Sequence, residues 1–258
     1  MMEKKYKLTE ETINVDGRTL YRIEALKDFG VVEKGDKGGF IENESNLSQS
    51  GDCWVYGNAK VSDNAMVCGN AKVYDNARVY GKATIYGDAK VYRDAKVYGY
   101  ARICGNAKVY GNAMVYGDVK VYCDARIYGN AKVCDNAKVC GDAKVFGNAN
   151  VYGNAMVYDN AEVYGDAKVC GNVDVCGNAE IRGDAVITSK SDYILFKNWW
   201  SSGRFFTWTR SNNMWKVGCF YGTGEELIEK AYKDSEMSGE EYERVVKYVE
   251  SILKANKL

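Results

Sequence analysis

Basic and aromatic residues recur in the middle of this 258-residue sequence at a spacing that would suit anion binding. The basic set repeats every eighteen residues and comprises Lys72, Lys90, Lys108, Arg126 and Lys144. An aromatic residue stands two positions after each, and the tyrosines among them are Tyr74, Tyr92, Tyr110 and Tyr128. Lysine and arginine pair with phosphates, and nucleobases stack on aromatic rings. The pattern therefore indicates a candidate aromatic–basic face for a nucleic acid or a nucleotide.

A structural interpretation of the same residues is stronger. Stacked tyrosines stabilise neighbouring strands by cross-strand packing, and lysines keep a β surface soluble. Acidic residues such as Asp63, Asp75, Asp88 and Asp94 lie between the basic ones, and the chain as a whole balances 35 basic against 35 acidic residues. We therefore favour a structural role over nucleic-acid binding, and keep a protein interface as a third use, because flat faces rich in tyrosine suit packing against another chain.

Catalytic and metal-binding residues are not indicated. The sequence contains no histidine, and its glycines recur at fixed turn positions rather than in a phosphate-binding loop. Zinc sites need cysteine or histidine within tetrahedral reach, and no Cys-x-x-Cys pair occurs. We expect no catalytic residue, no metal and no cofactor.

The cysteines and the N-terminal segment favour a reducing compartment. Nine cysteines are present, and the first residues, MMEKKYKLTEE, lack the apolar core of a signal peptide. No stretch is long and apolar enough for a membrane span. We expect free thiols, a cytoplasmic location and no membrane contact.

The elements that position these residues follow from an internal repeat. From Val55 to Ile187 every sixth residue is valine or isoleucine, without insertion or gap. Alanine stands two positions earlier from Val61 onward, except that Val119 and Val173 take its place. The unit is Ala-Lys-Val-Tyr-Gly-Asn. Its first four residues predict a short strand with alanine and valine on one face, and Gly-Asn predicts a turn.

A strand and a corner every six residues predict a coil with three short sides and about eighteen residues per turn. Stacked coils pair their strands in parallel and bury a column of valines, so stability comes from neighbouring coils. On one face cysteine and tyrosine alternate, as in Cys68, Tyr86, Cys104 and Tyr122. Cysteines two coils apart lie roughly 9–10 Å from each other, beyond the reach of a disulfide.

The pattern resembles the hexapeptide-repeat, left-handed β-helix family, in which a small residue stands two positions before an aliphatic one, as in Ala59-Lys60-Val61 and Ala107-Lys108-Val109. The resemblance covers about half of the chain and implies an all-β parallel, left-handed, three-sided solenoid. Many members are acyltransferases that use a histidine as general base and a loop that interrupts the repeats. This chain has neither feature, so we expect it not to be an enzyme.

The solenoid, residues 55–188, is predicted to be capped by residues 1–54. Asn14-Val15-Asp16-Gly17-Arg18 predicts a hairpin turn between strands at Tyr6–Ile13 and Thr19–Ala25. The strings YRIEALKDFG, KGDKGGFIE and NLSQSGDCWVY resemble the opening of uncharacterised hexapeptide-repeat proteins of bacteria and their prophages. The resemblance implies a phage or prophage origin.

Residues 189–258 predict a small α+β domain. Three strands are expected at Tyr193–Trp200, Arg204–Thr209 and Met214–Tyr221, followed by two helices that begin with capping boxes at Thr223 and Ser238. The aromatic and basic residues of this domain form a candidate binding surface: Trp199, Trp200, Arg204, Phe206, Trp208, Arg210 and Trp215. The alternative, given equal weight, is that one aromatic face packs on the end of the solenoid or on a partner subunit.

We therefore predict a non-enzymatic binding protein, in which a rigid solenoid presents a C-terminal domain for recognition or oligomerisation. A protein partner and a homo-oligomer are expected, and a nucleic acid or nucleotide is less favoured. If the protein is phage-encoded, it would bind or sequester a host factor such as a defence protein, a nucleic-acid enzyme or a nucleotide signal. The alternatives are a self-assembling structural protein and an atypical acyltransferase-like protein.

Overall fold

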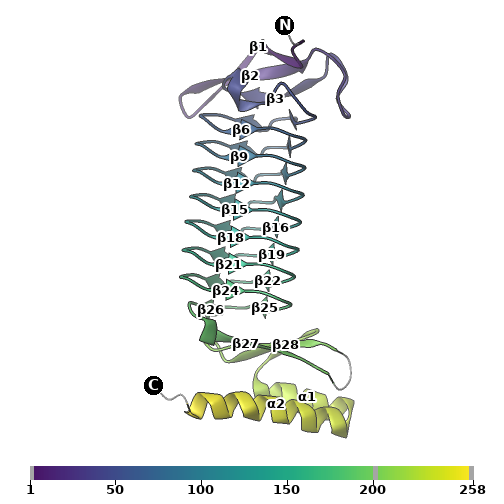
Figure 1. The fold of residues 1–258 in the computed structure, drawn as a ribbon, viewed down its shortest axis with the longest axis vertical. Helices are drawn as coiled ribbons and strands as arrows, with labels where there is room; N and C mark the ends of the chain where they lie inside the picture. Colours follow the sequence, from purple (N-terminus) through teal and green to yellow (C-terminus); the bar gives the residue numbers. More distant parts are fainter. Residues whose placement is uncertain (1–2, 200–202, 256–258) are drawn as a thin grey trace.

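The computed structural model describes residues 3–199 and 203–255, and shows a column of stacked coils with a β cap at one end and a small α+β unit at the other (Figure 1). The coils contain 23 strands of two residues each, which is nearly eight coils of three strands. Each strand pairs in parallel with the strand eighteen residues along the chain, as Lys90 does with Lys72 and with Lys108. The predicted parallel, three-sided solenoid is confirmed.

The three sides of the solenoid are three parallel sheets. The first contains β4 (Trp54–Val55), β7 (Lys72–Val73), β10 (Lys90–Val91), β13 (Lys108–Val109), β16 (Arg126–Ile127), β19 (Lys144–Val145), β22 (Glu162–Val163) and β25 (Glu180–Ile181). The second contains β5 (Lys60–Val61), β8 (Arg78–Val79), β11 (Lys96–Val97), β14 (Met114–Val115), β17 (Lys132–Val133), β20 (Asn150–Val151), β23 (Lys168–Val169) and β26 (Val186–Ile187). The third contains β6 (Met66–Val67), β9 (Thr84–Ile85), β12 (Arg102–Ile103), β15 (Lys120–Val121), β18 (Lys138–Val139), β21 (Met156–Val157) and β24 (Asp174–Val175).

The strands are shorter than the four residues that the sequence predicts, but backbone pairing extends beyond them. Around one coil the N–H groups of Lys72, Tyr74 and Asn76 donate to carbonyl groups of the next coil at 2.9–3.1 Å. Inside, the alanine and valine columns are fully buried, and Val119 and Val173 are accommodated at 0 and 1 % exposure. The core is thus a continuous column that no single coil could form alone.

The corners of the coils explain why glycine or aspartate recurs at the turn position of the six-residue unit. Most corner residues with positive φ are glycine, and at Gly99 (φ 73°) a Cβ would meet the backbone N of Gly117 at 2.8 Å. Where aspartate replaces glycine, its carboxylate accepts a hydrogen bond from the corner of the next coil. Asp135 (φ 61°) accepts from the N–H of Gly153 at 2.9 Å. These aspartates are therefore structural.

The N-terminal cap is an antiparallel unit of β1 (Tyr6–Val15), β2 (Arg18–Ala25) and β3 (Lys37–Ile41), followed by the 3-10 helix η1 (Glu44–Asn46). The predicted hairpin is present, with positive φ at Asp16 and Gly17. β3 pairs in parallel with β5 and so continues the second sheet into the cap. Lys5 is 1 % exposed, and its Nζ donates to the carbonyl oxygens of Gly51 and Cys53 at 3.1 and 2.9 Å.

The C-terminal unit begins after the 3-10 helix η2 (Lys190–Asp192). It contains four antiparallel strands rather than three: β27 (Tyr193–Lys197), β28 (Phe205–Thr209), β29 (Met214–Val217) and β30 (Phe220–Gly222). The predicted third strand is divided because Gly218 turns the chain with positive φ (54°). The helices α1 (Gly224–Asp234) and α2 (Glu236–Ala255) cover the face of this sheet that points away from the solenoid (Figure 1).

The helix starts test the two predicted capping boxes. Thr223 caps α1 as predicted, with the Glu226 side chain bonded back to its N–H at 2.8 Å. The prediction of a cap at Ser238 is wrong, since α2 already begins at Glu236. Ser235 takes this position instead, and its hydroxyl accepts a hydrogen bond from the Ser238 N–H at 3.1 Å. The serine three residues earlier satisfies the free N–H of the first turn.

Candidate functional site: the aromatic–basic face

The first sheet brings the predicted basic residues into one straight column. Lys90 lies directly between Lys72 and Lys108, and Arg126 lies between Lys108 and Lys144. Adjacent strands are about 4.8 Å apart, so five positive charges follow one another at that spacing. Like charges opposite each other on neighbouring strands destabilise a sheet. The column therefore opposes folding.

Among the described residues, only the last of these five cations forms an ion pair with a carboxylate. Lys144 pairs with Glu162 at 2.7 Å. Within residues 3–199 and 203–255, no ion pair within 4 Å joins Lys72, Lys90, Lys108 or Arg126 to a carboxylate. The lysine stems are half-buried on the sheet, whereas Lys96 and Lys132 on the second face are exposed. The three lysine stems from Lys72 to Lys108 thus pack partly on the sheet, Arg126 is exposed, and none of these four cations forms an ion pair with a described carboxylate.

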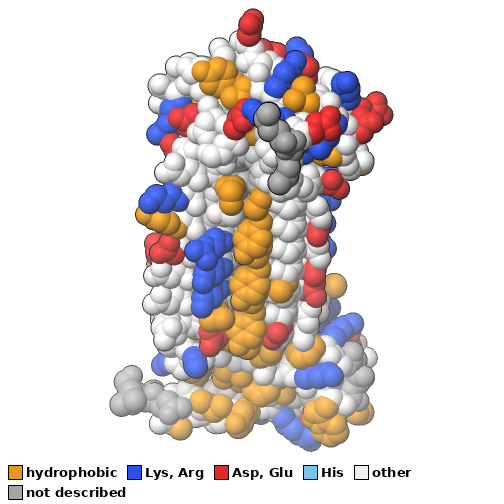
Figure 2. Space-filling view, turned by 45° about the horizontal axis from the view of Figure 1, so that its top comes forward, with side chains coloured by type: hydrophobic (Ala, Val, Ile, Leu, Met, Phe, Trp, Pro, Cys, Tyr) orange, Lys and Arg blue, Asp and Glu red, His pale blue; other side chains and the backbone are white. Residues whose placement is uncertain are grey.

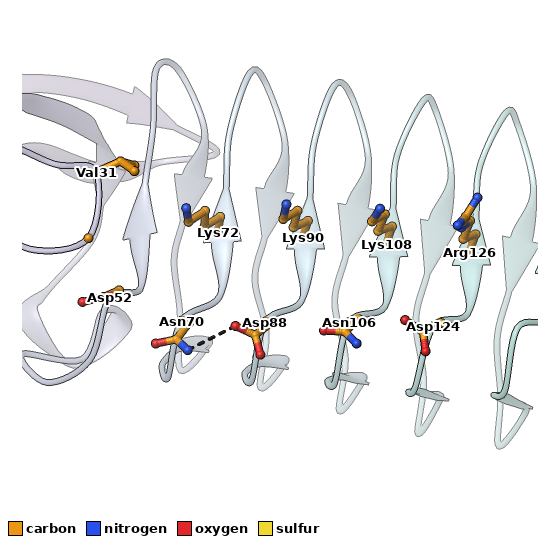
Figure 3. Close-up of a pocket in the computed structure, with 11 residues that line it drawn as sticks. Val31, Asp52, Asn70, Lys72, Asp88, Lys90, Asn106, Lys108, Asp124 and Arg126 are labelled. Atoms are coloured by element: carbon orange, nitrogen blue, oxygen red, sulfur yellow. Dashed lines mark hydrogen bonds between the residues drawn. The ribbon is translucent and has the colours of Figure 1, made fainter.

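A groove of about 770 Å³ runs along this column (Figure 3). One wall is basic, and the opposite wall is formed by side chains at the corner that precedes the sheet: Asp52, Asn70, Asp88, Asn106 and Asp124. Asn70 donates from Nδ2 to Asp88 Oδ1 at 3.1 Å, which holds part of this wall in place. Gly30 and the 75 % exposed Val31 line its end at the cap.

The charge of the groove changes along its length. A second groove, of about 560 Å³, also contacts Arg126 and is lined further on by Lys144, Glu162 and Glu180. The basic stretch therefore covers five coils and ends at two glutamates. A ligand with a longer row of anionic groups would meet repulsion there.

The tyrosine column beside the basic residues is a tight stack. From Tyr74 to Tyr164 the six rings lie 4.7–5.0 Å apart, with interplanar angles of 2–14°. A planar base cannot enter gaps of this size, because the ring faces already contact one another. Burial raises the pKa of Tyr74, Tyr92 and Tyr128 further above neutral pH. The stack presents ring edges and hydroxyl groups, and base stacking within the column is not available.

The C-terminal candidate residues are not gathered on one surface. Phe206, Trp208 and Trp215 are 0, 1 and 2 % exposed and form the core between the sheet and the helices. Trp199, at 84 % exposure, and Arg204 and Arg210 are exposed. Trp200 lies outside the described residues. The three buried rings therefore supply packing rather than an open contact surface.

The opposite face of the C-terminal sheet packs on the last coil of the solenoid. The Thr207 hydroxyl accepts a hydrogen bond from the N–H of Glu180 at 3.0 Å, and Lys216 pairs with Glu180 at 2.9 Å. The Tyr221 hydroxyl donates to the carbonyl oxygen of Arg182 at 3.3 Å. This arrangement is the packing on the solenoid end that the sequence offered as an alternative, and it combines these polar contacts with Tyr193 and Leu195, which pack against the core of the solenoid.

The third face shows the predicted alternation of cysteine and tyrosine. The column faces the viewer in Figure 2 and has a shorter basic column beside it. A hydrogen bond with Cys140, together with burial, raises the pKa of Tyr122 to about 12. All nine cysteines are free. Within the described part of the chain, no group of three or more metal-ligating side chains occurs.

The acidic and amide wall of the groove was not predicted as part of the site. Its members stand eighteen residues apart, as the basic residues do. The eighteen-residue period therefore predicts this column of acidic and amide side chains as well. The exposed Val31 lies outside the repeats and carries no such signal.

Comparison with known proteins supports the solenoid. The family model of a YdcK beta solenoid repeat matches residues 71–87, 101–117, 107–122 and 149–165, all within the coils. No curated protein matches the chain. Among the described residues, no helix has the length and apolar character needed to cross a membrane. The chain is a β-solenoid repeat protein.

Proposed function

We propose that this chain is a non-enzymatic binding protein, in which the solenoid is a rigid support and the aromatic–basic face binds an anionic protein partner. The observation that carries this proposal is the column of four cations, Lys72 to Arg126, which lines a groove and forms no ion pair with any described carboxylate. A sheet that keeps repelling charges in register gives up stability at those positions. A ligand with negative charges would relieve that repulsion.

The proposal that the chain is not an enzyme rests on its sequence. It contains no histidine, and the repeats continue from Val55 to Ile187 without an inserted loop. An acyltransferase-like activity is the alternative. Acetyl-CoA should leave the melting temperature unchanged, and a clear upward shift would favour that alternative, because a bound ligand stabilises the folded state.

The kind of partner follows from the resemblance of the opening segment to prophage-encoded hexapeptide-repeat proteins. We propose a bacterial host protein in the cytoplasm, such as a defence protein or a nucleic-acid enzyme, which the chain would bind or sequester. A nucleotide signal or a nucleic acid is less favoured, since the stacked rings from Tyr74 to Tyr164 offer no free faces between them.

The C-terminal unit is a second candidate for recognition or oligomerisation. Trp199, Met237 and Tyr248 are 84, 60 and 57 % exposed, and Tyr248 contacts Phe196 edge to face at 6.1 Å between ring centroids. Large exposed aromatic side chains are enriched at interfaces. Growth into open filaments is less favoured, because β1–β3 and β27–β30 cover the two ends of the coils.

Affinity capture from a bacterial lysate tests these alternatives. The intact protein is compared with a variant in which Lys72, Lys90 and Lys108 are changed to Glu, and with a matched control in which Lys96, Lys132 and Lys168 on the second face are changed to Glu. A protein partner lost only with the first variant supports the proposal. A partner retained by both but lost with Trp199→Ser and Tyr248→Ser would place recognition in the C-terminal unit instead.

A further inference from the structure

The repeat distance of the basic column restricts which anionic protein surface can match it. The cations of Lys72, Lys90, Lys108 and Arg126 follow one another at about 4.8 Å, the spacing of paired strands. Along one β-strand, side chains on the same face recur at about 6.7 Å. On a helix, residues three or four apart are about 5–6 Å from each other and wind around the axis. The side-chain spacing of a single strand or of a helix therefore does not match the spacing of the cations over five coils.

One protein surface has the required repeat. Side chains on adjacent strands of a sheet form a row across the strands with a spacing of about 4.7–4.9 Å. We propose, on the basis of the function proposed above, that the aromatic–basic face docks against a β-sheet or β-solenoid of another protein that carries a cross-strand row of up to five carboxylates. Each carboxylate would lie opposite one coil.

The flanking columns define the rest of the partner surface. On one side, Asp52, Asp88 and Asp124 repel further carboxylates but accept hydrogen bonds, so hydroxyl, amide or lysine side chains fit there. On the other side, the tyrosine stack presents phenol edges. The partner therefore carries no acidic row on the aspartate side, whereas on the other side the phenol hydroxyls can donate hydrogen bonds to acidic or neutral acceptors.

The two ends of the basic column limit how the partner slides. At one end Val31 and Gly30 of the cap line the groove, and at the other Glu162 and Glu180 replace the cations. A displacement of the partner by one coil towards Glu162 would place a carboxylate beside a carboxylate, which is destabilising. The face thus selects both the length and the register of the acidic row.

A second copy of this chain is a poor partner for the aromatic–basic face because its own solenoid faces are basic. At the outward-facing first residue of each strand, the second face is basic at most positions, including Arg78 and Lys96, and the third face is basic at three consecutive positions, Arg102, Lys120 and Lys138. None of these faces of the solenoid presents a continuous acidic row. Electrostatic complementarity therefore favours a different protein.

Peptide fibrils provide a probe with the proposed geometry. Parallel, in-register cross-β fibrils of a short glutamate-containing peptide display carboxylates every 4.7–4.8 Å or so. We expect the intact protein to bind these fibrils, and to bind soluble polyglutamate of equal charge or single-stranded oligothymidylate at least about tenfold more weakly. Fibrils of the same peptide with glutamine in place of glutamate should not bind.

Two double variants complete the test. Lys90→Gln with Lys108→Gln should weaken binding to the glutamate fibrils about tenfold, whereas Lys96→Gln with Lys132→Gln should change it less than about twofold. Equal binding of soluble polyglutamate would overturn the geometric match while leaving the proposed anionic partner intact. Equal loss with both double variants would overturn the assignment to this face, and no binding to glutamate fibrils would also refute the inference.

Discussion

Lys216 of the C-terminal sheet pairs with Glu180 of the last solenoid strand at 2.9 Å, and only 8 % of Lys216 is exposed. The same carboxylate accepts a hydrogen bond from the Tyr164 hydroxyl at 2.9 Å. Glu180 therefore connects the end of the aromatic stack to the C-terminal unit. The two parts of the molecule share one charged group rather than a purely apolar interface.

Replacing Lys216 with methionine should loosen this junction. The carboxylate of Glu180 would lose its only cation among the described residues, and breaking a half-buried pair of this kind costs about 1–3 kcal/mol. We expect a lower melting temperature and faster proteolysis between the coils and β28. Lys247→Met, which removes an exposed helix pair with Glu243, should lower the melting temperature much less, because solvent screens that pair. Equal effects of the two changes would show that the junction contributes no more than a surface contact.

Removing a charge from the basic column should stabilise the fold, in contrast to removing Lys216. Lys90 lies between Lys72 and Lys108, so Lys90→Gln removes two like-charge contacts and should raise the free energy of unfolding by about 0.5 kcal/mol. The gain should shrink at high salt because added ions screen the repulsion. Lys132→Gln, whose strand neighbours are Met114 and Asn150, should show no such gain. A loss of stability in Lys90→Gln at low salt would contradict the view that the column opposes folding.

Much of this fold could be predicted because one physical rule repeats. The six-residue spacing of Val55 to Ile187 predicts the strands, and the eighteen-residue spacing predicts which side chains share a column. The structure confirms both, down to the pairing of Lys90 with Lys108. The neighbours of Lys90 and Tyr92 on adjacent coils can be predicted from the eighteen-residue period alone, without any other knowledge of the tertiary structure.

The structure of the C-terminal unit was harder to predict from the sequence because this unit contains no internal repeat. Alternation separates Phe206 and Trp208 from Thr207 and Thr209, but does not say which set faces the helices and which faces the coils. The structure buries both sets, at 0–3 % exposure, because each face of the sheet has a cover. The break at Gly218 and the cap at Ser235 depend on local conformations that several residues could have adopted.

The aspartate corners provide a further test of the coil geometry. Asp135 holds φ at 61° and accepts a hydrogen bond from Gly153. Asp135→Ala should cost about 2 kcal/mol, since alanine disfavours this conformation and the acceptor is lost. Asp135→Gly should cost about 1 kcal/mol or less, because only the hydrogen bond is lost, and Asp135→Asn should be nearly neutral. Denaturant unfolding measures the order, and an alanine variant as stable as the glycine variant would refute the argument.

Alkaline pH should destabilise the solenoid through its tyrosines. The hydrogen bond with Cys134 and burial raise the pKa of Tyr116 to about 12, and Tyr122 is raised to about 12 in the same way by Cys140, from a reference of 10.0. A raised folded-state pKa means that the fold favours the protonated phenol. This stabilisation is complete below pH 10 and is lost as the pH rises towards about 12.

Melting temperatures measured from pH 8 to 12, together with phenolate absorbance, should show this loss. A variant with Tyr116→Phe and Tyr122→Phe should lose less stability over the same range, because two titrating groups are removed. Phenylalanine is already accommodated in a neighbouring stack, where Phe146 lies between Tyr128 and Tyr164 at 4.8 and 4.7 Å. If the wild-type tyrosines ionised near pH 10 without any fall in melting temperature, their burial and hydrogen bonds would not be coupled to folding.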